Sequence, residues 1–363
     1  MALLALLFAS CDGRSHSRQD SGEAVTPESL RSAVAVVYGN TPWLEANLRG
    51  EVAIVQPDGS FSTIETTGMY AGTPRVDGDA VYFSDQAADY RMDSEGIEKR
   101  ERSGPPNQID QWGGGVSGRH LTVFNSGTRN SARYGWDVSV WDTKALLSTT
   151  LFREMWDSVA CGSDAYFLMG PWHRRSKVGA ARLLRLTVAE HRIVVTKIGV
   201  IRSGRGGTRY RGLDCVDGSQ GPRLSLLRAI GRSWSVGQFE VGAGDPTWID
   251  VVGSNGPEID RYQTIGTGDG YVMVDWEKSQ VWRIDVDTGA FVKLFDLAYG
   301  GTAGYSLAGP QTLLVLAGAS DDLALTWYDL TSGAVTRHVP IGDLAEFFDG
   351  RGEVIEGAPL SLR

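Results

Sequence analysis

Short hydrophobic segments recur along the chain, separated by turns that contain glycine. Apolar and β-branched runs at 80–83, 120–124 and 271–274 each come soon after such a turn. Runs of this length between glycine-containing turns predict β-strands. The turn glycines are Gly78, Gly118, Gly162, Gly218, Gly268, Gly309 and Gly350, and the gaps between them are 40, 44, 56, 50, 41 and 41 residues.

A second hairpin pattern lies between successive glycine turns. Segment 281–285 alternates polar and apolar residues, turns at Asp287-Thr288-Gly289 and returns as segment 290–295. Segment 325–329 turns through Gly333 in the same way. An aspartate followed by a glycine between two alternating runs indicates a β-hairpin. Each repeat therefore contains four strands.

A repeat of this length with four strands predicts an all-β, seven-bladed β-propeller with four-stranded antiparallel blades, and six or eight blades are the alternatives. The ends of the chain complement each other. We expect a composite closing blade, with inner strands from 345–358 and outer strands from 51–66, and segment 32–38 is a candidate further strand. The repeat resembles the quinoprotein-type and YVTN-type propeller repeats over about residues 50–358.

The N-terminus has the pattern of a processing signal. Residues 2–8 are apolar but too few to span a bilayer. They lead into Phe8-Ala9-Ser10-Cys11, which resembles the lipobox of bacterial lipoproteins and implies a lipidated Cys11. A plain signal peptide with an incidental cysteine is the alternative. We expect a lipoprotein signal peptide at 1–11, a flexible tether at 12–30 and the propeller at 31–363, outside the cytoplasm and held at a bacterial membrane, periplasmic or at the cell surface, by the lipid anchor only.

The other two cysteines precede glycine turns of adjacent repeats. Cys161 lies one residue before its turn glycine and Cys215 lies three residues before the next. In an exported protein such a pair predicts a disulfide, with two free thiols as the alternative. Two cysteines with no histidine nearby provide too few ligands for a metal ion, so no metal site is predicted.

Charge is distributed unevenly along the chain. The net charge of −9 disfavours nucleic acid as a partner. Residues 129–232 nevertheless contain 18 Lys and Arg against 8 Asp and Glu, whereas the rest contains 17 against 36. These cations predict a basic rim on blades three to five that attracts an anionic partner, with solvated loops as the alternative. The candidate ligand-binding residues are Arg129, Arg133, Trp172, His173, Arg174, Arg175, Lys177, Arg202, Arg205, Arg209, Tyr210 and Arg211.

No set of residues in the sequence indicates catalysis. The five histidines are scattered, and no Gly-x-Ser-x-Gly motif is present. Trp141, Trp282 and Trp327 occupy equivalent repeat positions, which predicts packing between blades. We therefore predict no catalytic residue and no cofactor. The expected function is a non-enzymatic cell-envelope lipoprotein, a scaffold that binds a protein partner or an anionic envelope polymer through the basic rim. The alternative is a propeller enzyme, a hydrolase or quinoprotein-like, with its site at the central channel.

Overall fold

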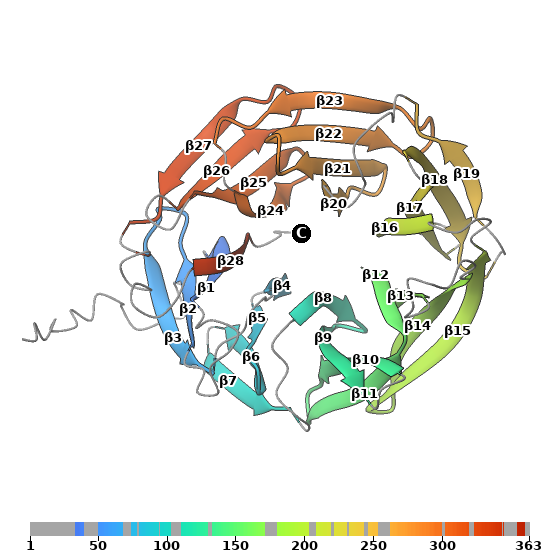
Figure 1. Ribbon diagram of the computed structural model, residues 1–363. Helices are drawn as coiled ribbons and strands as arrows, with labels where there is room; N and C mark the ends of the chain where they lie inside the picture. Colours follow the sequence, from blue (N-terminus) through green and yellow to red (C-terminus); the bar gives the residue numbers. More distant parts are fainter. Residues whose placement is uncertain are drawn as a thin grey trace, which may run out of the picture.

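Seven four-stranded antiparallel sheets form a closed ring in the computed structural model (Figure 1). This confirms the predicted all-β, seven-bladed β-propeller. The structure describes residues 33–39, 50–67, 74–77, 80–93, 95–102, 110–129, 133–170, 180–202, 208–218, 221–230, 232–242, 246–252, 262–299, 302–318, 323–342, 344 and 354–359.

Each blade runs from an inner strand near the ring axis to an outer strand at the circumference (Figure 1). Blade 1 is composite, and the other blades are continuous in sequence. The strands of blade 1 are β28 (Val354–Pro359), β1 (Ala35–Gly39), β2 (Gly50–Val55) and β3 (Phe61–Thr66); those of blade 2 are β4 (Arg75–Asp77), β5 (Ala80–Ser84), β6 (Ala88–Asp93) and β7 (Gly96–Glu101); those of blade 3 are β8 (Asp110–Val116), β9 (Arg119–Arg129), β10 (Arg133–Trp141) and β11 (Leu146–Phe152); and those of blade 4 are β12 (Glu154–Cys161), β13 (Asp164–Gly170), β14 (Ala180–Ala189) and β15 (Arg192–Arg202). Those of blade 5 are β16 (Thr208–Gly218), β17 (Gly221–Ile230), β18 (Ser233–Glu240) and β19 (Thr247–Asp250); those of blade 6 are β20 (Tyr262–Gly266), β21 (Gly270–Asp275), β22 (Gln280–Asp285) and β23 (Phe291–Asp296); and those of blade 7 are β24 (Thr302–Gly309), β25 (Thr312–Ala317), β26 (Ala324–Asp329) and β27 (Val335–Pro340).

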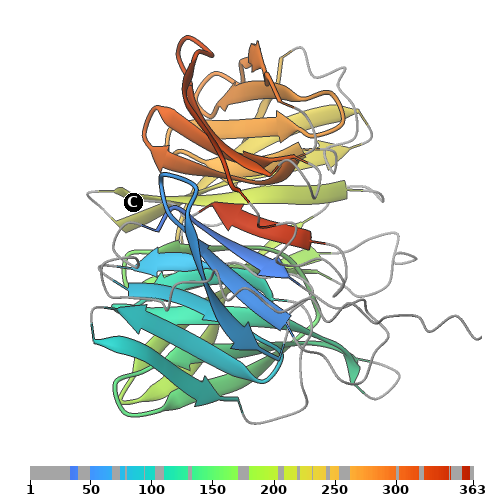
Figure 2. The ribbon, with the colours of Figure 1, turned by 90° about the vertical axis from the view of Figure 1, so that its left-hand side faces the viewer.

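The composite blade joins the two ends of the chain. Strand β28 pairs antiparallel with β1, with Val36 opposite Ala358, so the red and blue strands lie together in Figure 2. The predicted composite blade is confirmed, with one difference in the division of strands. We expected the C-terminal segment to supply the inner strands, but it supplies only β28 among the described residues, and β1 is the second strand. Because β1 is apolar along its whole length, it fits between two neighbouring strands better than at an edge.

The hydrophobic core is divided among the junctions between adjacent blades. At the junction of blades 6 and 7, Val274 and Val281 of blade 6 pack with Leu313 and Val315 of blade 7. Trp234, only 1% exposed, packs in the cluster between blades 5 and 6. Each junction resembles a two-sheet sandwich, so a blade is stabilised by both of its neighbours.

The predicted hairpin turns form as the sequence pattern indicates. Asp285 Oδ1 accepts hydrogen bonds from the backbone N–H of Asp287 and from the N–H and hydroxyl of Thr288. Gly289 then adopts a φ of 69°, a conformation that costs glycine little. A Cβ at this position would lie 2.3 Å from the carbonyl oxygen of Asp250 in blade 5, so the turn also requires glycine for a close approach to the next sheet.

The antiparallel order gives the ring two different faces. Turns between first and second strands, and between third and fourth strands, lie on one face, which we call the turn face. The connections between second and third strands, and between blades, lie on the other, which we call the loop face. No helix in the described ranges has the length and hydropathy of a membrane span.

Candidate functional site

Most of the predicted basic rim lies where no side chains are described. Of these residues, Trp172, His173, Arg174, Arg175, Lys177 and Arg205 lie outside the described residues, as does the predicted lipidation site Cys11. Arg129, Arg133 and Arg202 lie at strand ends on the loop face, and their backbone alone is described. The side chains of Arg209 and Arg211 are exposed on β16.

Tyr210 is buried, although the sequence places it among the residues of the rim. The ring is 3% exposed and stacks on Trp156, with ring centroids 5.4 Å apart. Because alternate residues of a strand point to opposite sides, Arg209 and Arg211 lie on the exposed side of β16, while Tyr210 packs at the junction of blades 4 and 5. Tyr210 is therefore a packing residue and contributes no ring to the surface.

The disulfide predicted between adjacent blades is present. Cys161 at the end of β12 is bonded to Cys215 in β16, with Cα atoms 5.7 Å apart. The bond joins blades 4 and 5 near the inner rim of the turn face. A disulfide indicates an oxidising, extracytoplasmic compartment.

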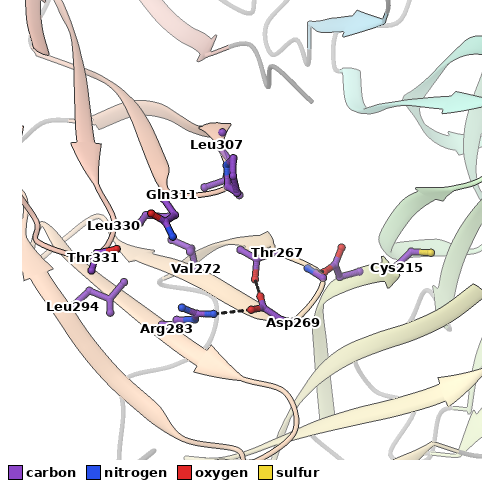
Figure 3. A pocket seen from close by; sticks show the side chains of 15 residues that line it. Cys215, Thr267, Asp269, Val272, Arg283, Leu294, Leu307, Gln311, Leu330 and Thr331 are labelled. Carbon is purple, nitrogen blue, oxygen red and sulfur yellow. Dashed lines mark hydrogen bonds and ion pairs between the residues drawn. The ribbon is translucent and has the colours of Figure 1, made fainter. Parts of the chain in front are cut away.

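A cavity of about 820 Å³ opens on the turn face, mainly between blades 6 and 7 (Figure 3). Its volume falls within the range of pockets that hold small molecules. Val272, Leu294, Leu307 and Leu330 provide apolar walls. The polar lining residues come from three blades: Asp214 from blade 5, Thr267, Asp269 and Arg283 from blade 6, and Gln311 and Thr331 from blade 7.

The guanidinium of Arg283 is held at the cavity by a carboxylate. Arg283 donates a hydrogen bond of 2.8 Å to Asp269 Oδ2, and the Thr267 hydroxyl donates one of 2.8 Å to Asp269 Oδ1 (Figure 3). The side chains of Arg283 and Asp269 are 47% and 68% exposed. This ion pair is therefore accessible to a bound molecule, and solvent screens its contribution to stability.

Asp214 provides a second carboxylate, which is buried in the cavity wall. Its Oδ2 accepts a hydrogen bond of 2.9 Å from the backbone N–H of Gly268 in the next blade. A Cβ on Gly266 would lie 2.1 Å from Asp214 Cγ, so only glycine leaves room for this carboxylate. Asp214 is thus fixed by the backbone of the turn that also carries Asp269.

Blade 4 contains a similar contact, which lies outside the cavity. Asp157 in β12 accepts a hydrogen bond of 3.0 Å from the backbone N–H of Leu213 in blade 5. Burial raises the pKa of Asp157, although the backbone hydrogen bonds oppose that effect. Asp157 does not line the cavity, whereas Asp214 does. An inner-strand carboxylate therefore joins blades in both places, but of the two only Asp214 lines the cavity.

The sequence did not identify this cavity. Asp269 and Gln311 lie in predicted turns, but nothing in their local pattern separates them from other turn residues. The available signal was the presence of polar residues at successive inner turns. Among the residues that the structure describes, no group of three or more His, Cys, Asp or Glu side chains is arranged to hold a metal ion.

Comparison with known protein families and with curated proteins finds no match. Among solved structures, the chain is similar to the periplasmic gluconolactonase PpgL of Pseudomonas aeruginosa, with a TM-score of 0.50, 14% identity and coverage of 91% of this chain and 98% of that chain. It is also similar to apo AztD from Citrobacter koseri, with a TM-score of 0.50, 10% identity and coverage of 90% and 98%. A putative 6-phosphogluconolactonase from Bacteroides fragilis has a TM-score of 0.46 and 14% identity, with coverage of 85% of this chain and 97% of that chain. At these identities the likeness shows the propeller fold alone.

These findings correct the expected function. We expected a non-enzymatic scaffold that binds through a basic rim on blades three to five. The fold, matched over 91% of the chain, is instead shared with a gluconolactonase. The concave site with converging polar groups lies on the turn face at blades 5 to 7, away from that rim. A count of charges along a segment did not locate this site, because the site is assembled from single residues of separate blades.

Proposed function

We propose that this protein is an extracytoplasmic propeller hydrolase that opens a small hydroxylated lactone in the cavity between blades 6 and 7. The observation that carries the proposal is a carboxylate, Asp214, and a guanidinium, Arg283, in the lining of one cavity with apolar walls. The similar P. aeruginosa protein is a periplasmic gluconolactonase, which supports the choice of substrate class.

In the proposed reaction, water adds across the acyl–oxygen bond of the lactone. Asp214 accepts a proton from the attacking water, whose hydroxyl group joins the carbonyl carbon. Arg283 donates hydrogen bonds to the carbonyl oxygen while that oxygen gains negative charge. The ring C–O bond then breaks, and Asp214 returns the proton to the ring oxygen. The product is an open hydroxy acid, so atoms and charge balance without a cofactor.

The remaining polar lining suits a hydroxylated substrate. Gln311 and Thr331 lie in the wall formed by blade 7 (Figure 3). Their amide and hydroxyl groups both donate and accept hydrogen bonds, as sugar hydroxyls also do. The apolar side chains between them would cover the carbon skeleton of the substrate.

The test is hydrolysis of δ-gluconolactone followed by acid release at constant pH, with the spontaneous rate subtracted. We expect Asp214→Asn to lower kcat by about 100-fold or more, since loss of a general base has effects of that size. Glu190→Gln is the matched control, because it removes one carboxylate from an exposed ion pair with Arg192 on blade 4. Full activity of Asp214→Asn, or no hydrolysis of this lactone by the unaltered protein, would overturn the proposal.

We also propose that Cys11 carries a lipid anchor, because residues 8–11 resemble a lipobox. We further propose that the repeat is of the quinoprotein and YVTN type, which it resembles in sequence. We expect Cys11→Ser to move the protein from the membrane fraction to the soluble fraction, and mass spectrometry of the unaltered protein to find a diacylglycerol-sized addition on Cys11. A mature chain with an unmodified Cys11 would contradict the anchor.

A further inference from the structure

The charges around the cavity restrict which lactones can enter it. Its described lining contains two carboxylates, Asp214 and Asp269, and a single cation, Arg283. The cation is already paired, because Arg283 donates to Asp269 Oδ2 at 2.8 Å. The described lining therefore has a net charge of −1, because Asp269 neutralises the charge of its one cation. The remaining N–H groups of Arg283 can still donate to a carbonyl oxygen, but no excess positive charge in the described lining attracts an incoming anion.

Several backbone N–H groups of the lining already have partners within the protein. Many proteins bind phosphate with backbone N–H groups at a loop or a helix end. At this cavity the N–H of Thr267 bonds the carbonyl of Gly270, and the N–H of Gly268 bonds Asp214. On the blade 7 side, the N–H of Leu330 bonds the Gln311 carbonyl and that of Thr331 bonds Asp329 Oδ1, while Pro310 has no N–H.

We infer that the cavity selects uncharged lactones over phosphorylated ones, and that Asp269 enforces the selection by neutralising the charge of Arg283. This inference rests on the proposed function and deepens it. A phosphate on the substrate would lie among two carboxylates, and like charges placed together without a counter-ion strongly disfavour binding. Neutral hydroxyl groups meet no such repulsion and can use Gln311 and Thr331.

The same arrangement has an effect on the product. Hydrolysis converts a neutral lactone into a carboxylate, so a negative charge appears in a cavity that already has a net negative charge. Repulsion from Asp214 and Asp269 then favours release of the hydroxy acid. The same two carboxylates therefore allow the uncharged substrate to bind and promote release of the anionic product.

The experiment compares δ-gluconolactone with its 6-phosphate, by kcat/KM for each, at low ionic strength. For the unaltered protein we expect the uncharged lactone to be preferred by about 100-fold. Added salt should reduce this preference, because screening weakens the repulsion. Hydrolysis of neither lactone would contradict the proposed function itself. Hydrolysis of both at similar kcat/KM, or a preference for the phosphate, would overturn only the inference.

Variants of Asp269 test whether this residue, acting through Arg283, determines the preference for the uncharged lactone. Asp269→Asn removes one charge and releases Arg283, so we expect the preference to fall by about 10-fold, chiefly through a lower KM for the phosphate. Asp269→Glu keeps the charge and should keep most of the preference. Glu190→Gln, the control with the same charge change on an exposed ion pair, should leave the preference unaltered. An unchanged preference in Asp269→Asn would overturn the role of Asp269.

Discussion

Two junctions on the turn face contain a carboxylate paired with an arginine, but they differ in burial. Between blades 3 and 4, Asp142 is fully buried, and it pairs with Arg119 and, at 2.5 Å, with Nδ1 of His191 in the next blade. Between blades 6 and 7, Asp269 is 68% exposed beside a cavity. Asp142 therefore joins two blades through His191, whereas Asp269 remains accessible to a ligand.

The difference shows in the electrostatics of Asp142. Its hydrogen bond from Arg119, together with that from His191, holds the pKa of Asp142 well below the ordinary value of 3.8, although burial opposes this effect. Arg100 also donates to the backbone carbonyl of Asp142. A carboxylate that is buried and hydrogen-bonded in this way has a structural role. An ion pair can bind a ligand only where a cavity lies beside it.

The junction of blades 4 and 5 is closed covalently, and removing its bond should have the largest effect on stability. The disulfide spans 54 residues of sequence, and constraining a loop of that length contributes about 3–4 kcal/mol to the free energy of unfolding. We expect the double variant Cys161→Ser, Cys215→Ser to lose about that amount in urea unfolding. A reducing agent should destabilise the unaltered protein to the same level and have no further effect on the variant. A loss below about 1 kcal/mol would show that this junction does not depend on the bond.

The next largest effect should come from Asp142. Asp142→Asn removes the charge that pairs with Arg119 and His191, both partly exposed, and we expect a loss of about 1–2 kcal/mol in the free energy of unfolding. Asp269→Asn should change it by less than about 0.5 kcal/mol, because that pair is exposed. Equal effects in the two variants would remove the distinction between a structural and an accessible ion pair.

The smallest of the expected effects is a difference in how acid changes the stability of the unaltered protein and of Asp142→Asn. Because the pKa of Asp142 is lowered in the folded state, its contribution to stability is fully present above pH 4, near the unfolded value of 3.8. It is lost as the pH falls from there toward the folded pKa, since the unfolded chain binds the proton first. We expect Asp142→Asn to be less sensitive to acid below pH 4 than the unaltered protein, measured by unfolding at successive pH values. An identical acid dependence would contradict the assignment.

The sequence was sufficient for the architecture because the relevant signals are local. An aspartate and a glycine a few residues apart specify several of the hairpins, as Asp285 and Gly289 do. The disulfide was also predictable, since its two cysteines occupy similar places in adjacent repeats. The strand alternation that buries Tyr210 between Arg209 and Arg211 is visible in the sequence as well, but the net charge of a segment does not distinguish the two sides of a strand.

The cavity was not predictable because its chemistry comes from three blades. Asp214 lies on an inner strand, Asp269 and Gln311 lie at inner turns, and about 40 to 55 residues separate one from the next. No spacing rule links such residues, since the ring brings them together only after every blade has formed. Their burial also differs, and burial decides whether a turn aspartate joins two blades or faces a cavity.

The pairing of β28 with β1 determines when the molecule can finish folding. Strand β1 (residues 35–39) can pair with β28 (residues 354–359) only after nearly the whole chain has been synthesised. A chain that emerges gradually from a ribosome or a translocation channel can form its middle blades early, but it cannot close the ring until the last strand arrives. Until then the first blade lacks its inner strand, and the apolar strand β1 has an unpaired edge that is prone to aggregation. Pairing of the two ends thus leaves the folded ring without an open sheet edge at blade 1. It also makes ring closure a late folding step, before which the chain is prone to aggregation.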